Sequence, residues 1–326
     1  MTIAVDLMGG DLGPRSTLPA SLVFAGSFPE LNLTLFGDEQ QLQLPDLPAN
    51  VTFVHSPDTV AMDDKPALAL RQKQQSSMWQ AIETVADERA SACVSAGNTG
   101  ALMAMGKFML KTYPGIDRPA ICKAVPCRGG HCYMLDLGAN LDCTSEQLEQ
   151  FALMGSILAE SDGIRHPVVG LLNVGSEHIK GHEQIRLAAN SLTANPRIRY
   201  GGFVEGDGIF SGEFDVVVTD GFAGNVALKV GEGAARLLGE QLQEQLQSHW
   251  LGRLAGQIAS PLLRKWHTKF DPARYNGASF LGLQGIVVKS HGSADERGFG
   301  HALQVAREQA IHGVPQKINQ QIAELV

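Results

Sequence analysis

Short apolar runs alternate along the chain with helical segments, and this alternation constrains the fold more than any other feature. Ile3–Val5 is followed by a Gly-rich turn and a helical stretch near Thr17–Gly26, and Ala92–Ser95 is followed in the same way by Ala101–Lys111. Strands separated by helices are typical of a largely parallel sheet with helices on both faces. The run Asp215–Val218 contains three consecutive valines, as expected for a strand covered on both faces. We therefore predict an α/β protein with three α/β/α layers.

The sheet should be mixed, and it should belong to one domain. Ile121–Val125 and Cys132–Leu137 are separated by the turn Arg128–Gly130, which favours two adjacent strands joined directly. No low-complexity segment or fixed-period repeat divides the chain. Residues 1–326 are therefore predicted to form a single domain.

Residues 234–275 break the alternation, because they form helical sequence without a strand. Apolar residues recur there at every fourth position, with basic residues among them. We predict a helical pair that projects from the sheet. Burial against a second copy and docking to anionic lipid both explain the spacing, and the sequence leaves both open. The candidate membrane contacts are Trp250, Leu251, Leu254, Ile258, Leu262 and Trp266.

Composition excludes several classes of protein. The formal net charge of −8 gives no overall basic footprint of the kind that nucleic-acid binders show. The five cysteines contain no C-x-x-C pair, so we expect reduced thiols in a cytoplasmic protein. No apolar run reaches the roughly 18 residues of a membrane-spanning helix. Membrane association, if present, should therefore be peripheral.

Six clusters of Gly with Asp, Asn, Lys or Ser follow the predicted strands. Ligands of open α/β sheets bind beyond the carboxyl ends of the strands. Gly lets the backbone approach a ligand closely, and N–H groups that open a helix favour an anion. We predict that the clusters converge on one anion-binding cleft, although each alone is also an ordinary strand-to-helix turn. The substrate-binding candidates are Asp6, Gly9, Gly10, Asp11, Gly97, Asn98, Thr99, Gly100, Asp136, Asn140, Asn173, Asp220, Gly224 and Lys289.

Familiar cofactor and nucleophile motifs are missing. There is no G-x-x-x-x-G-K-[ST] loop and no G-x-S-x-G turn, and Gly206–Gly212 only approaches a dinucleotide fingerprint. His178 and His182 stand four residues apart but lack the Glu of H-E-x-x-H. We therefore predict neither a cofactor nor a metal.

At these turns the chain closely resembles the phosphate acyltransferases of bacterial phospholipid synthesis, which transfer acyl groups from acyl carrier protein to phosphate. The matches occur in order along the whole chain. They are Asp6–Pro14, Ala92–Leu102, Leu135–Cys143, Leu171–Glu177, Asp220–Lys229, Tyr275–Ala278 and Val288–Gly292.

The resemblance implies a fold shared with isocitrate and isopropylmalate dehydrogenases and with phosphotransacetylases, and it implies a homodimer. The acyl phosphate product would feed glycerol-3-phosphate acylation at the membrane, where a glycerol-3-phosphate acyltransferase is a possible partner. The resemblance also makes Lys180 and Asn225 the catalytic candidates. Ala223 stands where relatives often have Thr, which puts a hydroxyl contact there in doubt.

The implied chemistry needs no Ser–His pair, because phosphate is already an oxygen nucleophile near pH 7. Lys180 would hold the phosphate or the oxyanion by charge, and Asn225 would donate a hydrogen bond to the oxyanion from a position just before a helix. His291 is a candidate acid for the leaving thiolate. A surface lysine, a helix N-cap and a loop histidine are the ordinary alternatives for these three residues.

Two other functions remain open at this point. One is a coenzyme-A-dependent phosphotransacylase on the same fold, and the other is a non-catalytic membrane scaffold for acyl carrier protein. Pure docking would not need six Gly-rich turns around one cleft. A coenzyme-A enzyme would need an adenine-nucleotide pocket, for which no basic cluster is evident.

Overall fold

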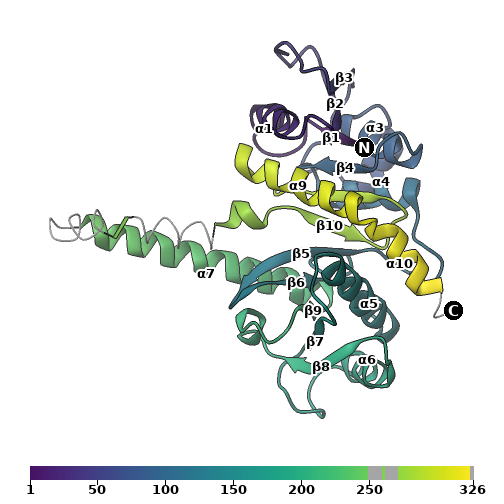
Figure 1. Ribbon diagram of the computed structural model, residues 1–326, viewed down its shortest axis with the longest axis vertical. Helices are drawn as coiled ribbons and strands as arrows, with labels where there is room; N and C mark the ends of the chain where they lie inside the picture. Colours follow the sequence, from purple (N-terminus) through teal and green to yellow (C-terminus); the bar gives the residue numbers. More distant parts are fainter. Residues whose placement is uncertain (249–258, 261–270, 324–326) are drawn as a thin grey trace.

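The computed structural model describes residues 1–248, 259–260 and 271–323, and shows one large mixed sheet between two layers of helices (Figure 1). The strands are β1 (Thr2–Asp6), β2 (Asn32–Gly37), β3 (Val51–His55), β4 (Ala92–Ser95), β5 (Ala120–Cys127), β6 (Gly130–Leu135), β7 (Val168–Leu172), β8 (Arg199–Val204), β9 (Val216–Val218), β10 (Ala278–Leu281) and β11 (Ile286–Lys289). The helices are α1 (Pro14–Ser27), α2 (Pro66–Gln72), α3 (Ser77–Ala86), α4 (Thr99–Leu110), α5 (Ser145–Ser161), α6 (Glu183–Ala194), α7 (Gly221–Gln247), α9 (Glu296–His312) and α10 (Val314–Ala323), with 3₁₀ turns η1 (Gly208–Phe210) and η2 (Pro272–Tyr275). The predicted three-layer α/β class is confirmed.

The strand order is β3-β2-β1-β4-β11-β10-β5-β6-β9-β7-β8. Neighbouring strands from β3 to β11 are parallel, and those from β6 to β8 are parallel as well. Strand β10 is antiparallel to both of its neighbours, and β5 and β6 form an antiparallel hairpin. Because of this hairpin, the strands from β6 to β8 run opposite to β1, β4 and β11. The mixed sheet and the adjacency of β5 and β6 were both predicted.

Alternate residues of the strands face two different helix layers. Cys93, Phe280, Val287 and Val217 belong to one core cluster, which extends across the sheet under α3, α4 and the start of α7. The opposite face divides into two core clusters, one under α1 and α9 and one under α5, α6 and α10. The arrangement of these layers is visible in Figure 1. Helices thus cover both faces of the sheet, as the apolar strand sequences require.

Local capping explains where several helices begin. Thr144 and Gln147 form a capping box at the start of α5, and Ser76 accepts the N–H of Trp79 at the start of α3. Asp295 caps α9, which ends at Gly313 in the left-handed conformation. Such caps satisfy N–H groups that have no partner inside the helix.

Helix α7 begins earlier than predicted. The sequence suggested a start near Gly224, but Asp220 accepts the N–H of Ala223 and the helix begins at Gly221. Asn225 therefore lies inside the second turn and not just before the helix. The two glycines obscured this start, because Gly is a poor helix former. Strand β10 and helix α2 were also missed, since both are short and lack clear periodicity.

The outer part of α7 leaves the body of the protein (Figure 1). Its 27 residues extend about 40 Å. Leu237, Leu238 and Leu242 are exposed on this part. The predicted protrusion of residues 234–275 thus begins as a continuation of a longer helix. The six candidate membrane contacts from Trp250 to Trp266 lie outside the described residues.

Replacing Gly224 by Ala should destabilise the protein, because a Cβ there would overlap the carbonyl oxygen of Asp136. We expect a loss of about 1–3 kcal/mol in the free energy of unfolding, measured by denaturant titration. Gly233→Ala is the matched control, since no atom lies within 4 Å of a Cβ at that position of the same helix. It should stabilise by up to about 1 kcal/mol. Equal effects of the two substitutions would contradict the packing of α7 on the Asp136 turn.

Candidate active site

The polar turns lie in two groups of three, one at each end of the strands. The turns after β1, β4 and β11 leave one end of the sheet, because these strands are adjacent and parallel. The turns after β6, β9 and β7 leave the opposite end. The six turns therefore leave the sheet in two groups, and α7 runs back from the second group toward the first.

Asp6 holds the first group together. Its carboxylate is 1 % exposed and accepts hydrogen bonds from the hydroxyls of Ser77 and Ser95, each at 2.6 Å. Burial raises the pKa of this carboxyl, although the hydrogen bonds oppose the shift. Gly9 lies so close to Gly97 that a Cβ would meet the Gly97 backbone nitrogen at 2.5 Å. Asp6 and these glycines therefore fix the shape of the turns.

Asn98 joins the start of α4 to the loop before α2. Its Oδ1 accepts the N–H of Ala101 at 3.0 Å, and its Nδ2 donates to the carbonyls of Met62 at 3.0 Å and Asp64 at 2.8 Å. With these bonds made, Asn98 positions the loop over the end of β4. Thr99–Gly100, in the first turn of α4, are exposed to solvent.

The turn after β11 contacts the turn after β1. The N–H of Asp11 donates to the carbonyl of Gly292 at 2.7 Å, and the preceding Gly10 has a positive φ of 93° that favours Gly. Lys289 is buried, and its ammonium donates to the carbonyls of Ala96 and Ser290. Burial lowers the pKa of Lys289 to about 8. A positive charge is thus held beneath this end of the sheet.

His291 projects from the same turn into solvent. Its backbone N–H donates to Oδ1 of Asn276 at 2.8 Å, which fixes the start of the turn. On the ring, Nδ1 accepts the backbone N–H of Ser293 at 3.2 Å and lies 2.9 Å from the Ser293 hydroxyl. Partial burial and the nearby Lys229 ammonium lower the pKa of His291.

Asp136 organises the second group as Asp6 does the first. It accepts the N–H groups of Ile121, Ala139 and Asn140 at 2.9, 3.1 and 2.6 Å, and burial raises its pKa. Asn140 in turn donates to the carbonyl of Pro119 and accepts the N–H of Gly221 at 2.7 Å. These contacts attach the turn after β6 to the start of α7.

The loop after β7 carries Lys180 into solvent. Asn173 is buried, and its Nδ2 donates to the carbonyls of Gly175 at 3.0 Å and Lys180 at 3.2 Å. The Lys180 ammonium lies 3.0 Å from Glu177, and its side chain is 48 % exposed. Exposed pairs of this kind are weak, so Lys180 is available to an anionic ligand.

Asn225 stands exposed on α7, beside Gly138 of the turn after β6. Gly224 packs against the backbone of Asp136 and so fixes the rotation of the helix about its axis. No hydrogen bond or ion pair joins Lys180, Asn225 and His291 to one another in the part of the chain that the structure describes. The structure places Lys180 and Asn225 after the neighbouring strands β7 and β9, and His291 at the other end of the sheet.

Lys229 connects the two groups. It lies one turn after Asn225 on α7, and its ammonium is 3.5 Å from Nε2 of His291. It also contacts Glu232 at 3.0 Å, and Glu232 contacts Lys123 of β5 at 2.9 Å. Neither Lys229 nor Lys123 is among the predicted site residues. The helical spacing of Asn225 and Lys229 was the available signal, since residues four apart share a face.

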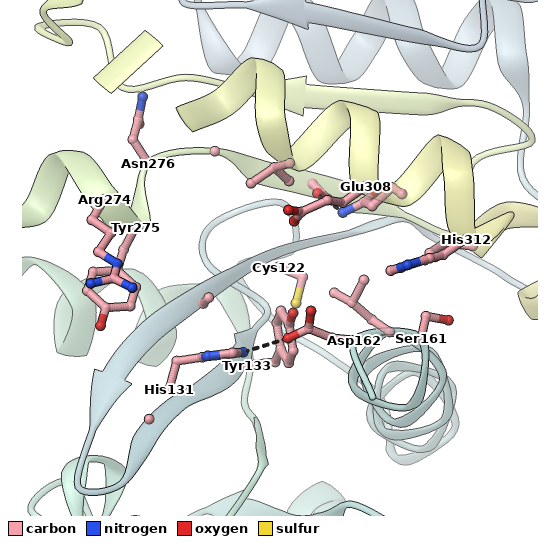
Figure 2. A pocket seen from close by; sticks show the side chains of 18 of the residues that line it. Cys122, His131, Tyr133, Ser161, Asp162, Arg274, Tyr275, Asn276, Glu308 and His312 are labelled. Carbon is pink, nitrogen blue, oxygen red and sulfur yellow. Dashed lines mark hydrogen bonds and ion pairs between the residues drawn. The ribbon is translucent and has the colours of Figure 1, made fainter. Parts of the chain in front are cut away.

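A cavity lies on the face of the sheet that α5 and α9 cover, opposite α3 and α4 (Figure 2). Its volume is about 780 Å³, and its walls come from β5, β6, β10, α5, α9, α10 and η2 with the two residues that follow it. Figure 2 shows His131 and Asp162 joined as an ion pair at 3.0 Å, with Glu308 and His312 on the α9 side. None of the predicted site residues lines this cavity. It arises where the two core clusters of this face separate, so we do not assign it to the predicted site.

No group of three or more His, Cys, Asp or Glu side chains suited to a metal ion occurs within residues 1–248, 259–260 and 271–323. His178 packs against the ring of Phe203, with centroids 5.7 Å apart. None of the described helices is long and apolar enough to cross a membrane.

The three-layer mixed sheet is the fold of solved phosphotransacetylases. A Streptococcus pyogenes phosphotransacetylase matches with a TM-score of 0.63 at 16% identity, covering 95% of this chain and 94% of that chain. A 4-hydroxythreonine-4-phosphate dehydrogenase from Klebsiella pneumoniae matches with a TM-score of 0.53 at 12% identity, covering 95% and 99%. At these identities the likeness shows the fold alone.

The sequence matches are closer. The family described as "Fatty acid synthesis protein" covers residues 1–317. Proteins named phosphate acyltransferase match at 49% identity in Pseudomonas putida and at 51% in Pseudomonas savastanoi pv. phaseolicola. The first match covers 99% of this chain and 98% of the relative, and the second covers 97% and 95%. The chain therefore belongs to the phosphate acyltransferase family of fatty-acid and phospholipid synthesis, as the turn motifs indicated.

The ion pair between His131 and Asp162 should make the free energy of unfolding depend on pH. The contact with Asp162 raises the pKa of His131, and the same contact lowers the pKa of Asp162, so the pair stabilises the fold while both groups are charged. This stabilisation is lost as the pH rises through the raised pKa of His131. His131→Gln should therefore lower the free energy of unfolding by up to about 1 kcal/mol near pH 6, because both side chains are partly exposed.

Near pH 9 the difference between His131→Gln and the wild type should shrink. His182→Gln, at an exposed histidine without an ion pair in the described chain, is the control and should show no such trend. Thermal unfolding at the two pH values measures both variants. If His131→Gln lowers the stability by the same amount at both pH values, the ion pair does not contribute to stability.

Proposed function

We propose that the chain transfers a long-chain fatty acyl group from acyl carrier protein to inorganic phosphate, giving acyl phosphate and free carrier thiol. The observation that carries this proposal is the placement of Lys180 and Asn225. Both are exposed after adjacent strands, Lys180 on a loop fixed by Asn173 and Asn225 on a helix whose start packs against the Asp136 turn. A cation and an amide donor in this arrangement suit an anionic nucleophile and a developing oxyanion.

The thiol in this region is protonated, which favours direct attack by phosphate. Cys143 follows the Asp136 turn, and burial raises its pKa to about 12. A protonated thiol is a poor nucleophile, so an acyl-enzyme at Cys143 is disfavoured. Phosphate oxygen would instead form the new C–O bond, and the C–S bond of the tetrahedral intermediate would then break.

Each candidate residue has a separate role in this reaction. Lys180 would neutralise charge on the phosphate or the oxyanion, and Asn225 would donate its amide N–H to the oxyanion. The departing thiolate needs a proton, and His291 is our candidate donor. Because its lowered pKa favours the neutral ring near pH 7, His291 takes this role only when a bound anion raises that pKa.

Exposed apolar residues beside Asn225 favour a long acyl chain. Phe222, Val226 and Val230 follow one another at every fourth position of α7 and are 66 %, 46 % and 64 % exposed. They form a continuous stripe along the helix next to the face of Asn225 and Lys229. An acyl chain lying on this stripe would be partly removed from water while its carbonyl stays near Asn225.

The outer part of α7 and the family resemblance support the other proposed partners, which are a second copy of the chain, the membrane surface and a glycerol-3-phosphate acyltransferase. The exposed Leu237, Leu238 and Leu242 suit a homodimer contact, with peripheral attachment to the inner face of the cell membrane farther along the protrusion. The protein would then work in the cytoplasm at the membrane surface and pass acyl phosphate to a glycerol-3-phosphate acyltransferase.

A coenzyme-A thioester is the alternative donor, because solved phosphotransacetylases share the fold. The apolar stripe on α7 is the feature that favours a long-chain donor over an acetyl group. A non-catalytic scaffold would not require the fixed Lys180 and Asn225 turns. Activity with acyl coenzyme A and none with acyl carrier protein would support the first alternative.

Release of carrier thiol from palmitoyl–acyl carrier protein tests the proposal directly. Wild-type protein should release thiol only when phosphate is present, and Lys180→Ala should lose roughly 10²-fold or more of this rate, as removal of one charge-stabilising group typically does. Circular dichroism would confirm that the variant is folded. Phosphate-independent release would indicate a hydrolase, and no release would favour the alternatives.

The chain-length preference tests the apolar stripe. Val226→Asn with Val230→Asn should lower kcat/KM for a palmitoyl donor about tenfold, because burial of each methylene is worth about 0.8 kcal/mol. The same double variant should change kcat/KM for a butyryl donor much less. Val23→Asn is the control, since Val23 is similarly exposed on α1, away from this helix. Equal losses for both donors would rule out an acyl chain on this stripe.

A further inference from the structure

A contact between α7 and the turn after β11 joins two nitrogen atoms. The ammonium of Lys229, from α7, lies 3.5 Å from Nε2 of His291, from the turn after β11. The two residues come from halves of the sheet that run in opposite directions. Both side chains are open to solvent, with Lys229 52 % exposed.

The tautomer of His291 makes both nitrogen atoms of this contact hydrogen-bond donors. Nδ1 lies 3.2 Å from the backbone N–H of Ser293, which can only donate. Nδ1 is therefore an acceptor, and the proton of the neutral ring is on Nε2. Nε2–H and the Lys229 ammonium are then both donors, and they point to the same space. Two such donors need an acceptor, and an anionic oxygen satisfies both.

The surrounding charges are mainly positive. Lys229 and Glu232 of α7, Lys289 of β11 and Lys123 of β5 all act on His291. Glu232 is the one carboxylate among these four, and it already contacts both Lys123 and Lys229. Lys289 donates to carbonyl oxygens, and the carboxyls of Asp6 and Asp11 oppose its charge in part. The field at this point therefore attracts an anion.

Neighbouring hydrogen bonds hold the His291 turn in place before any ligand arrives. Asn276 accepts the N–H of His291 at 2.8 Å and donates to the hydroxyl of Ser290 and the carbonyl of Gly298, each at 2.8 Å. Asn276 is 5 % exposed, so these bonds are shielded from water. A preorganised donor costs little ordering when it binds an anion.

We propose that Lys229 and His291 form the binding site for the phosphate that accepts the acyl group. This inference rests on the proposed function and adds the location of the nucleophile. Lys229 and Asn225 are one turn apart on the same face of α7, so their Cβ atoms are about 5–6 Å apart. Phosphate held by Lys229 would thus lie beside the amide proposed to stabilise the oxyanion. Bound phosphate would also raise the pKa of His291, which its role as proton donor requires.

The ordinary alternative is that Lys229 only pairs with Glu232 on the helix surface. Such an i,i+3 pair contributes a few tenths of a kcal/mol. It does not explain why the ammonium also approaches a second donor from the other half of the sheet. The two interpretations differ in what inorganic phosphate does to His291.

The test is an NMR titration of the full chain with inorganic phosphate, without an acyl donor, that follows the ring nitrogens of His291. His291→Gln assigns the signal. Wild-type protein should show saturable shifts and a higher His291 pKa with phosphate bound. Lys229→Gln should weaken phosphate binding tenfold or more, and Lys229→Arg should largely restore it. Arg236→Gln, an equal charge change farther along the same exposed helix, should bind phosphate as the wild type does.

Turnover separates this inference from the proposed function. With a palmitoyl donor, Lys229→Gln should raise the KM for phosphate tenfold or more and leave the KM for the carrier substrate unchanged. Phosphate binding at His291 without any thiol release would sink the proposed function and leave the anion site standing. Unchanged phosphate affinity in folded Lys229→Gln, or His291 signals that ignore phosphate in the wild type, would overturn the site.

Discussion

The antiparallel pairing of β5 with β6 determines where every polar turn of this protein lies. It reverses the direction of the strands from β6 to β8, so that their carboxyl ends face away from those of β1, β4 and β11. An unbroken parallel sheet would gather all six turns at one edge. Here the turns form two groups, and a single site needs an element that runs between them. Helix α7 is that element, since it starts in the second group and brings Lys229 to His291 in the first.

Close packing at the start of α7 fixes this connection. Gly221 and Gly224 let the helix approach the Asp136 turn more closely than any side chain would allow. The buried carboxylates Asp6 and Asp136 then each fix the backbone of one group of turns through several hydrogen bonds. Buried acids of this kind shape a site by fixing its backbone. The exposed cations and amides that remain are the groups free to bind an anionic substrate.

The sequence predicted most of the fold because its signals are local. Apolar strand runs and helix caps located the main elements, and the turn motifs indicated the family. Asp6 and Asp136 were chosen as substrate contacts, yet both are buried and bonded to the protein, which local sequence cannot reveal. Lys229 was missed because its importance comes from a contact with His291, 62 positions away. The direction of the strands was also hard to predict, since a turn motif does not show at which end of the sheet it lies.

The central claim is that phosphate itself attacks the acyl thioester. The most direct measurement is the fate of ¹⁸O-labelled inorganic phosphate incubated with the wild-type protein and palmitoyl–acyl carrier protein, followed by mass spectrometry. We expect palmitoyl phosphate that carries the label, formed in equal amount to the carrier thiol released. Free palmitate in place of labelled acyl phosphate would contradict it.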